Sequence, residues 1–348
     1  MGFSIEQLKA ILAKIELKAN HEFDTPPTCL EINGEFGKRT FATLGNFSVI
    51  LARHKVGKST FSAIGISSLL SGNEILNFVP TIPSDRKIVL WFDTEQGKPE
   101  AVSIIRTISK LVNGKAELHP ENLIYIPLRS YNKDERLQII EFALEYYSDV
   151  FFVVIDGIRD LVSAINNEDE ANLIVGKLMK WTEVKNIHIL TVLHQNKGDS
   201  NARGHLGSEL VNKSEIVVSL EKDIENGTRK TIVKCEDSRH KEFENFAYSL
   251  NEDGTPYKKE IKVGYQPENP KVDQLTTTQI LSVVKEVFKD GKLMTYKPLY
   301  TALQEQLKKI HNISFGIDKA KDLVVRLKND NYIRYYEETK TYQYYIPN

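Results

Sequence analysis

The stretch from residue 52 to residue 60 combines small, basic and hydroxyl side chains in the spacing of a phosphate-binding loop. It reads Ala52, Arg53, His54, Lys55, Val56, Gly57, Lys58, Ser59 and Thr60. In such a loop, backbone N–H groups at a helix N-terminus point at phosphate oxygens, and glycine keeps the tight turn free of side chains. Lys58 would contact the β- and γ-phosphates, and Ser59 would bind Mg²⁺. The spacing therefore predicts a site for ATP with Mg²⁺.

Ala52 stands at a position where this loop usually has glycine. Alanine can replace that glycine if its φ is negative. The alternative interpretation is a lysine-rich surface turn. The apolar run "FSVIL" before Ala52 and the helical pattern after Lys58 favour the loop, because a buried strand leading into a helix is its usual setting.

Two carboxylates follow other apolar runs. Asp156 ends "VFFVVID", and Glu95 lies just beyond "KIVLWFD". Parallel α/β sheets bind ligands at the C-terminal ends of their strands, so Asp156 is a candidate ligand of Mg²⁺. Glu95 is a candidate base or orienting group for a hydrolytic water. The alternatives are that Asp156 is a cap or turn residue, and that Asp93 or Glu95 caps the next helix.

A further apolar run, "IHILTVL", ends in His194 and Gln195. An amide at a strand end can hydrogen-bond a γ-phosphate and report its loss to the following loop, which makes Gln195 a candidate sensor. The glycine-containing stretch up to residue 207 is expected to contact DNA, with Arg203 as its candidate DNA-binding residue, or a neighbouring subunit. The alternative is an exposed structural loop. His194 has no second metal ligand at a useful spacing, so zinc is not expected.

These residues are expected to be positioned by an α/β sheet of mainly parallel strands. The apolar runs are 47–51, 87–93, 122–128, 150–156 and 187–193, and helical stretches are expected at 59–70, 100–112, 134–147 and 169–184. Continuous apolar strands separated by helices are typical of parallel strands buried on both faces. After residue 210, strand patterns with turns at Asn226 and Asp253 predict antiparallel strands at the sheet edge.

The C-terminal part predicts a separate small domain. Three amphipathic stretches at 276–290, 296–310 and 316–331 precede an alternating hairpin pattern, which is the order of a winged helix. Residues 271–348 carry 13 Lys or Arg and 9 Asp or Glu, so positive charge is concentrated there. The third helix offers Lys319, Lys321, Arg326 and Lys328 to DNA phosphates. The alternative partner of this domain is another protein.

We therefore predict an N-terminal helix or arm at 1–39, an ATPase domain at 40–255, a linker at 256–270 and a winged helix at 271–348. The whole chain has a formal net charge of -1 and two cysteines, which excludes a uniformly basic coat and a disulfide framework. The N-terminal stretch carries charges throughout and fits neither a signal peptide nor a membrane span. A cytoplasmic protein without a membrane partner is expected.

The order of these motifs resembles RecA-fold ATPases, particularly the RepA-like hexameric helicases of plasmids and other mobile elements. The resemblance rests on the phosphate loop, "DTEQG", the strand ending in Asp156 and "HQNKG…ARGHLGSEL", and it covers about residues 40–250. It implies a RecA-like core that assembles into a hexameric ring or a filament. Single-stranded DNA is the expected partner of the core loops. The winged helix is not part of the ATPase core that the resemblance covers, and duplex DNA is its expected partner.

The resemblance also implies roles for single residues. Lys58 and Ser59 match the nucleotide loop, Glu95 the catalytic glutamate, Asp156 the metal aspartate, and His194 with Gln195 the sensor. Arg239, in "VKCEDSRHKEF", matches an arginine of DnaB-type helicases that reaches the γ-phosphate of the neighbouring subunit. The lysine that usually lies two residues before it is Asp237 here, so Arg203 and Lys213 are alternatives.

The leading hypothesis is an ATP-hydrolysing replication helicase of a mobile element that oligomerises on DNA. The alternative is a regulatory or recombination-accessory ATPase that assembles on DNA in an ATP-dependent way and unwinds nothing. A small-molecule kinase is a third candidate, although the sequence shows no lid or acceptor pocket.

Overall fold

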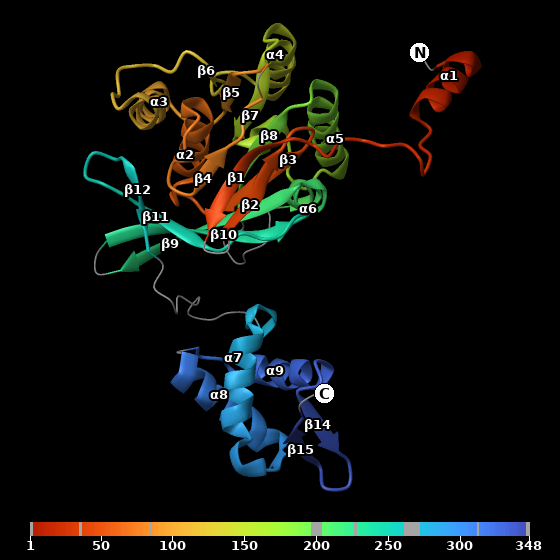
Figure 1. The fold of residues 1–348 in the computed structure, drawn as a ribbon, viewed down its shortest axis with the longest axis vertical. Coiled ribbons are helices and arrows are strands. Elements are labelled where there is room, and N and C mark those ends of the chain that lie inside the picture. The colour runs from red at the N-terminus through yellow and green to blue at the C-terminus, as the bar shows by residue number, and fades with distance from the viewer. Residues whose placement is uncertain are drawn as a thin grey trace. The chain divides into compact units, whose positions relative to one another are not determined.

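The computed structural model describes residues 3–34, 37–83, 85–195, 204–225, 228–260, 272–311 and 313–345 of the 348-residue chain. The chain forms two compact units, Met1–Glu260 and Ile261–Asn348 (Figure 1). In the described parts of the chain, no helix is both long and apolar enough to cross a membrane.

A nine-stranded sheet in the order β12-β11-β10-β9-β3-β8-β7-β5-β6 forms the centre of the first unit. The strands that run parallel are β3 (Phe47–Ala52), β5 (Ile88–Asp93), β6 (Leu123–Pro127), β7 (Val150–Asp156), β8 (His188–His194) and β9 (Ile216–Glu225). The antiparallel strands are β10 (Thr228–Ser238), β11 (Phe246–Leu250) and β12 (Pro256–Lys259). The predicted α/β class, with a mainly parallel sheet and antiparallel edge strands, is confirmed. One detail differs, because β9 pairs in parallel with β3 before the chain turns back.

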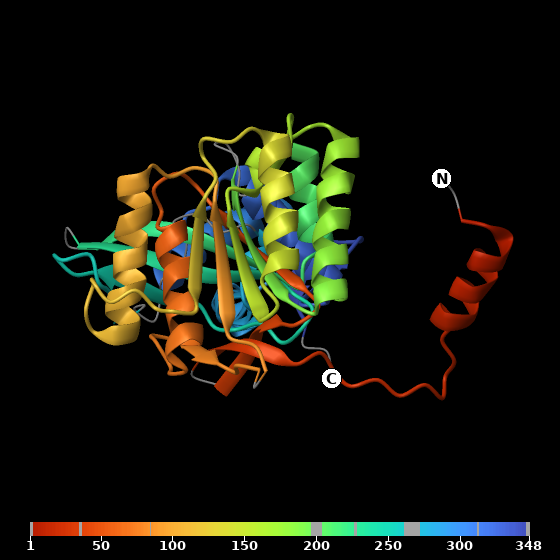
Figure 2. The same ribbon diagram turned by 90° about the horizontal axis from the view of Figure 1, so that it is seen from above.

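Helices cover both faces of this sheet, as Figure 2 shows. One face packs on α2 (Lys58–Ser71) and α3 (Lys98–Asn113), and the other on α4 (Lys133–Tyr146), α5 (Glu168–Lys185) and α6 (Gly204–Lys213). Alternate residues of β3 therefore enter two different cores: Ile50 belongs to the core that includes Phe61 of α2, whereas Val49 belongs to the core that includes Leu178 of α5. Burial on both faces explains why the strand sequences are continuously apolar.

The segment before β3 differs from its prediction. Helix α1 (Ile5–Ile15) is present and begins with a capping box of Ser4 and Gln7, and none of its side chains is buried against the described part of the chain. β1 (Thr28–Gly34), however, pairs with β2 (Gly37–Thr43) and β4 (Phe78–Pro80) in a second sheet, and its Leu30 belongs to the core. The first compact unit thus includes this segment before residue 40, because β1 contributes Leu30 to the same core as α2.

The second unit contains α7 (Thr277–Val287), α8 (Tyr296–His311) and α9 (Ile317–Asn329), followed by the hairpin of β14 (Ile333–Tyr336) and β15 (Thr341–Tyr344). A short strand β13 (Met294–Thr295), which the sequence did not predict, pairs with β15. Two 3-10 turns, η2 (Val272–Gln274) and η3 (Lys289–Gly291), flank α7. β12 occupies the start of the segment expected as a linker, and residues 261–271 lie outside the described ranges.

Candidate nucleotide-binding site

The predicted phosphate loop lies between β3 and α2 at the C-terminal edge of the parallel strands. Gly57 has a φ of 103° and Lys55 a φ of 59°, so the backbone turns sharply just before the helix begins. A Cβ on Gly57 would lie 2.9 Å from Tyr248 Oη. Ala52 is a buried ladder residue of β3, opposite His194 of β8, and it is not among the residues with positive φ. Glycine is therefore unnecessary at position 52.

The amine of Lys58 is held inside the loop. Its Nζ donates to the carbonyl of Arg53 at 3.3 Å and lies 3.1 Å from Nδ1 of His194. The side chain is 8% exposed. Burial lowers the pKa of Lys58, and the carboxylates of Glu95 and Asp156 act in the opposite direction. A desolvated ammonium at the mouth of the loop is suited to bind phosphate oxygens.

Ser59 and Asp156 form an oxygen pair at the first turn of α2. Ser59 Oγ donates to Asp156 Oδ2 at 2.7 Å, and Gln96 Nε2 lies 3.5 Å from Ser59 Oγ. The pKa of Asp156 is raised to about 7, chiefly by burial and also by the charges of Asp93 and Glu95, while the hydrogen bond from Ser59 acts in the opposite direction. A hydroxyl and a buried carboxylate are hard oxygen donors, which is the ligand chemistry of Mg²⁺. The two residues therefore fit the predicted metal site.

His194 connects Lys58 with Glu95. Its Nε2 lies 3.0 Å from Glu95 Oε1, while Nδ1 faces Lys58. With Lys58 charged, Nδ1 accepts from the ammonium, and the Nε2–H donates to the carboxylate. This hydrogen bond is the main reason why the pKa of Glu95 is lowered, so Glu95 is ionised at neutral pH. The ring of His54 lies against that of His194, with centroids 4.5 Å apart.

Asp93 shapes the turn that carries Glu95. The buried Asp93 Oδ1 accepts from the backbone N–H groups of Glu95 and Gln96, each at 2.9 Å, and Oδ2 accepts from the hydroxyl of Tyr125. The N-cap of α3 is Gly97, which has no side-chain cap. The alternative that Asp93 or Glu95 caps this helix is therefore wrong.

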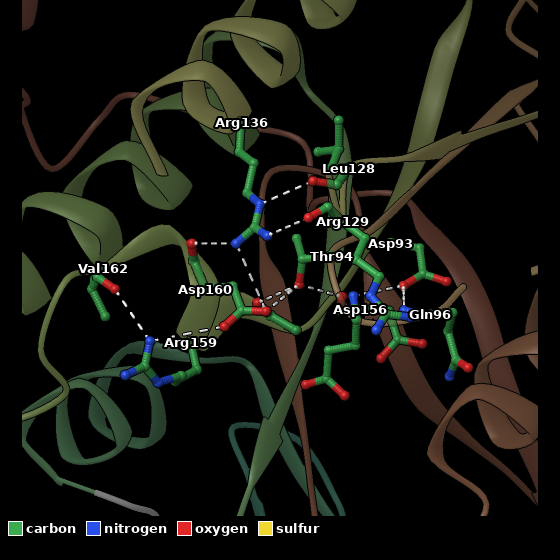
Figure 3. Close-up of polar contacts among 12 residues, drawn as sticks. Asp93, Thr94, Gln96, Leu128, Arg129, Arg136, Asp156, Arg159, Asp160 and Val162 are labelled. Atoms are coloured by element: carbon green, nitrogen blue, oxygen red, sulfur yellow. Dashed lines mark hydrogen bonds and ion pairs between the residues drawn. The ribbon is translucent and has the colours of Figure 1, made fainter. Parts of the chain in front are cut away.

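A polar network connects the C-terminal ends of β5 and β7 (Figure 3). Thr94 Oγ1 lies 3.0 Å from Asp160 Oδ2 and 3.1 Å from the carbonyl of Asp156. Arg136 donates to the carbonyls of Leu128 and Asp160, each at 3.0 Å, which ties α4 to the segments that follow β6 and β7. Sequence reasoning missed this network, because a helical arginine and a threonine after a strand carry no signal of their tertiary partners.

Gln195 lies directly after β8, and its backbone N–H donates to the carbonyl of Ala52 at 3.1 Å. It lines a cavity of about 310 Å³ beside the phosphate loop, together with Arg53, Val56, Leu220, Glu221, Lys222 and Glu236. The predicted sensor is thus next to the loop. The stretch that follows, including Arg203, lies outside the described residues.

Arg239 follows β10 on the side of the sheet where the parallel strands begin, opposite the side that carries the phosphate loop. There Ser238 pairs with Ile216, the first residue of β9. Its Nη2 donates to the carbonyl of Lys213 at 2.9 Å. Strand β3 runs from this edge to the phosphate loop, so Arg239 cannot reach the loop of its own chain. Lys213, the alternative, is the last residue of α6 and lies beside Arg239.

Four of the five basic residues predicted to contact DNA lie on α9 of the second unit, and the fifth, Arg203, lies outside the described residues. Arg326 Nη1 donates to the carbonyls of Val272 and Leu275, so it holds the turn η2 against α9. Lys321 lies 3.8 Å from Asp318, and the amines of Lys319 and Lys328 lie over aromatic rings. Lys328 is exposed and the other two lysines are partly exposed.

Three side chains that the sequence did not single out contact the phosphate loop from β10 and β11. Arg229 donates to the carbonyl of Lys55, Thr231 Oγ1 to that of Val56 at 2.9 Å, and Tyr248 Oη to that of Gly57 at 2.8 Å. Each of the three lies far in sequence from the loop residue that it contacts, with separations of 174, 175 and 191 residues. Only the pairing of β3 with β9 brings them to the loop.

Comparison with known proteins places this site in a family. A family model described as AAA domain matches residues 15–200, which is just over half of the chain. The match spans the phosphate loop, the strands that end in Asp156 and His194, and Glu95 just after β5. No curated protein matches the chain. The chain therefore belongs to the AAA domain family, and its nine-stranded unit is a core of the P-loop ATPase type.

Proposed function

We propose that the protein hydrolyses ATP with Mg²⁺ as an oligomer on DNA and acts as the replication helicase of a mobile element. The observation that carries the ATPase part is the joint geometry of Lys58, Ser59, Glu95, Asp156 and His194. Five residues from four separate segments converge at one edge of the sheet, with hydrogen bonds of 2.7–3.1 Å linking them. No single motif requires this arrangement, whereas phosphoryl transfer to water uses all of it.

Each side chain has a defined task in that reaction. The loop N–H groups and Lys58 bind the phosphates, and Ser59 with Asp156 would hold Mg²⁺, which would supply positive charge against that of the phosphates. Glu95 orients the attacking water and accepts its proton. His194 holds Glu95 Oε1 and contacts Lys58, so loss of the γ-phosphate is expected to change both hydrogen bonds together.

Replacing Lys58 by alanine tests the proposal. We expect the ATPase rate to fall by about 10²-fold, because removing one preorganised donor for phosphoryl charge costs about that much. Forked-DNA strand displacement, measured on the same samples, should fall in parallel. Lys115→Ala, an exposed lysine after α3, is the matched control and should change neither rate. A Lys58→Ala protein with the wild-type ATPase rate would contradict the ATP site.

The same assay separates the helicase from an accessory ATPase. If DNA stimulates hydrolysis in the wild-type protein and no strand is displaced, the helicase part of the proposal is wrong and the accessory role is assigned.

Oligomerisation is supported by Arg239, whose position at the opposite ends of the strands from the phosphate loop suits a phosphate bound by a neighbouring subunit. Particle mass is to be measured with a non-hydrolysable ATP analogue and single-stranded DNA. A monomer under all conditions would overturn the ring or filament.

We further propose that the second unit is a winged helix that binds DNA phosphates through α9. Three helices followed by a hairpin support this assignment, and so does the excess of basic residues. We expect the double change Lys321→Ala and Lys328→Ala to lower the slope of log affinity against log salt by about 2, since each phosphate contact contributes about 1. Lys285→Ala with Lys289→Ala, a change of equal charge near the end of α7, is the control. Equal slopes for the two double variants would favour a protein partner.

A further inference from the structure

Three consecutive carbonyls of the phosphate loop are held by side chains of one hairpin. The carbonyls of Lys55, Val56 and Gly57 accept hydrogen bonds from Arg229, Thr231 and Tyr248 respectively. Thr231 and Tyr248 lie directly opposite each other in the ladder of β10 and β11. The loop is therefore fastened along one side to a rigid pair of strands.

This fastening fixes where the loop N–H groups point. A peptide group is planar and trans, so its C=O and N–H point in opposite directions. When the carbonyls of residues 55, 56 and 57 face the hairpin, the N–H groups of residues 56, 57 and 58 must face away from it. That is the side on which a concave set of N–H groups binds an anion such as a phosphate.

The two hydroxyl groups act where water cannot replace them. Thr231 is 5% exposed and Tyr248 is 1% exposed. A Cβ on Gly57 would meet both hydroxyls, at 2.9 Å from Tyr248 Oη and 3.4 Å from Thr231 Oγ1. Gly57 is thus required by its φ of 103° and by the closeness of these hydroxyls. The phosphate loop therefore packs directly against the hydroxyl groups of the hairpin.

We propose that Thr231 and Tyr248, assisted by Arg229, are positioning residues that preorganise the phosphate loop for the triphosphate of ATP. They contact no phosphate themselves and act through the direction of three peptide groups. The inference rests on the proposed ATP site. A loop whose carbonyls were free to rotate would have to order its N–H groups upon binding, which weakens affinity.

Paired substitutions at Thr231 separate this role from simple packing. Thr231→Val keeps the shape and removes the hydroxyl, whereas Thr231→Ser keeps the hydroxyl and removes a methyl group. The dissociation constant of a fluorescent ATP analogue is to be measured for both, with urea unfolding monitored on the same samples. We expect Thr231→Val to weaken binding by about 2- to 10-fold, the effect of one hydrogen bond, and Thr231→Ser to bind as the wild type does.

Tyr248→Phe is the second variant. It removes only the hydroxyl that donates to the carbonyl of Gly57 and keeps the ring that packs in the core, so it should weaken binding to a similar degree. Ser249→Ala is the control, because that hydroxyl donates to the carbonyl of Arg229 within the hairpin and not to the loop. Unchanged affinity in both Thr231→Val and Tyr248→Phe would overturn the inference, as would equal weakening by Thr231→Val and Thr231→Ser. Failure of the wild-type protein to bind the analogue would instead refute the ATP site itself.

Discussion

Replacing Glu95 by glutamine is expected to lower the rate constant of ATP hydrolysis by about 10²- to 10⁴-fold while ATP binding persists. Glutamine has the size of glutamate, and its Oε1 can still accept from Nε2 of His194, so the link to Lys58 is preserved. What is lost is a carboxylate that can accept a proton from water. Single-turnover hydrolysis and binding of a fluorescent analogue, measured side by side, separate the two effects.

The pH dependence gives this prediction a second measurement. The pKa of Glu95 is lowered, chiefly by the hydrogen bond from His194. An acid with a lowered pKa stays ionised to lower pH, so protonation of Glu95 should not reduce the wild-type rate between pH 8 and about 5. Glu100→Gln, an exposed residue in the first turn of α3, is the matched control and should hydrolyse ATP normally. Near-normal turnover by Glu95→Gln would assign the role of base to another group.

Replacing Asp156 by asparagine is expected to stabilise the protein without metal at alkaline pH, although it impairs hydrolysis. Burial raises the pKa of Asp156 from 3.8 to about 7. The folded state therefore keeps a proton that the unfolded chain releases near pH 4. Ionisation of Asp156 costs no stability below pH 4, costs more as pH rises toward 7, and reaches a constant penalty of about 4 kcal/mol above it. Asparagine does not ionise, so burial carries no such penalty for it, and its amide oxygen can still accept the hydrogen bond from Ser59 Oγ.

Urea unfolding in a chelator at pH 8 and pH 5 measures the effect. The stability difference in favour of Asp156→Asn should be largest at pH 8 and should change little down to pH 7. Between pH 7 and pH 5 it should shrink by about 1.4 kcal/mol per pH unit. Trp91 and Trp181 both lie in the first unit, so their fluorescence reports on its unfolding. Glu117→Gln, an exposed carboxylate, is the control and should show no such trend. If the stability difference between Asp156→Asn and the wild type is equal at both pH values, burial does not raise the pKa of Asp156.

Much of the site could be predicted because its signals are local in sequence. A glycine, a lysine and a hydroxyl at fixed spacing identify the loop, and apolar runs that end in Asp156 and His194 mark strand ends. Parallel strands bring those ends to one edge, which is why separate motifs converge. Ala52 replaces the usual glycine of this loop without conflict, because the residue belongs to the ladder of β3 and not to the turn.

The remaining features depend on which segments meet in space. Asp93 looks like a helix cap in the sequence, yet its partners are two backbone N–H groups and Tyr125, which lies 32 positions later. Thr231 and Tyr248 reach the loop only because β9 continues the sheet beside β3. Strand β1 was missed because its alternation is short and its partners, β2 and β4, flank the phosphate loop on both sides in sequence. Pairing of this kind leaves no periodic pattern.

The position of β3 at the middle of the sheet has a consequence during synthesis. Its neighbours are β8 and β9, so Phe47 pairs with Ile189, 142 residues later in the chain. At the usual speed of a ribosome, about 5–20 residues per second, the wait lasts on the order of 10 s. Throughout that time the six apolar or small residues "FSVILA" have no strand beside them. The segment that leads into the phosphate loop is therefore also an apolar strand that the nascent chain must keep from aggregating until its neighbours are made.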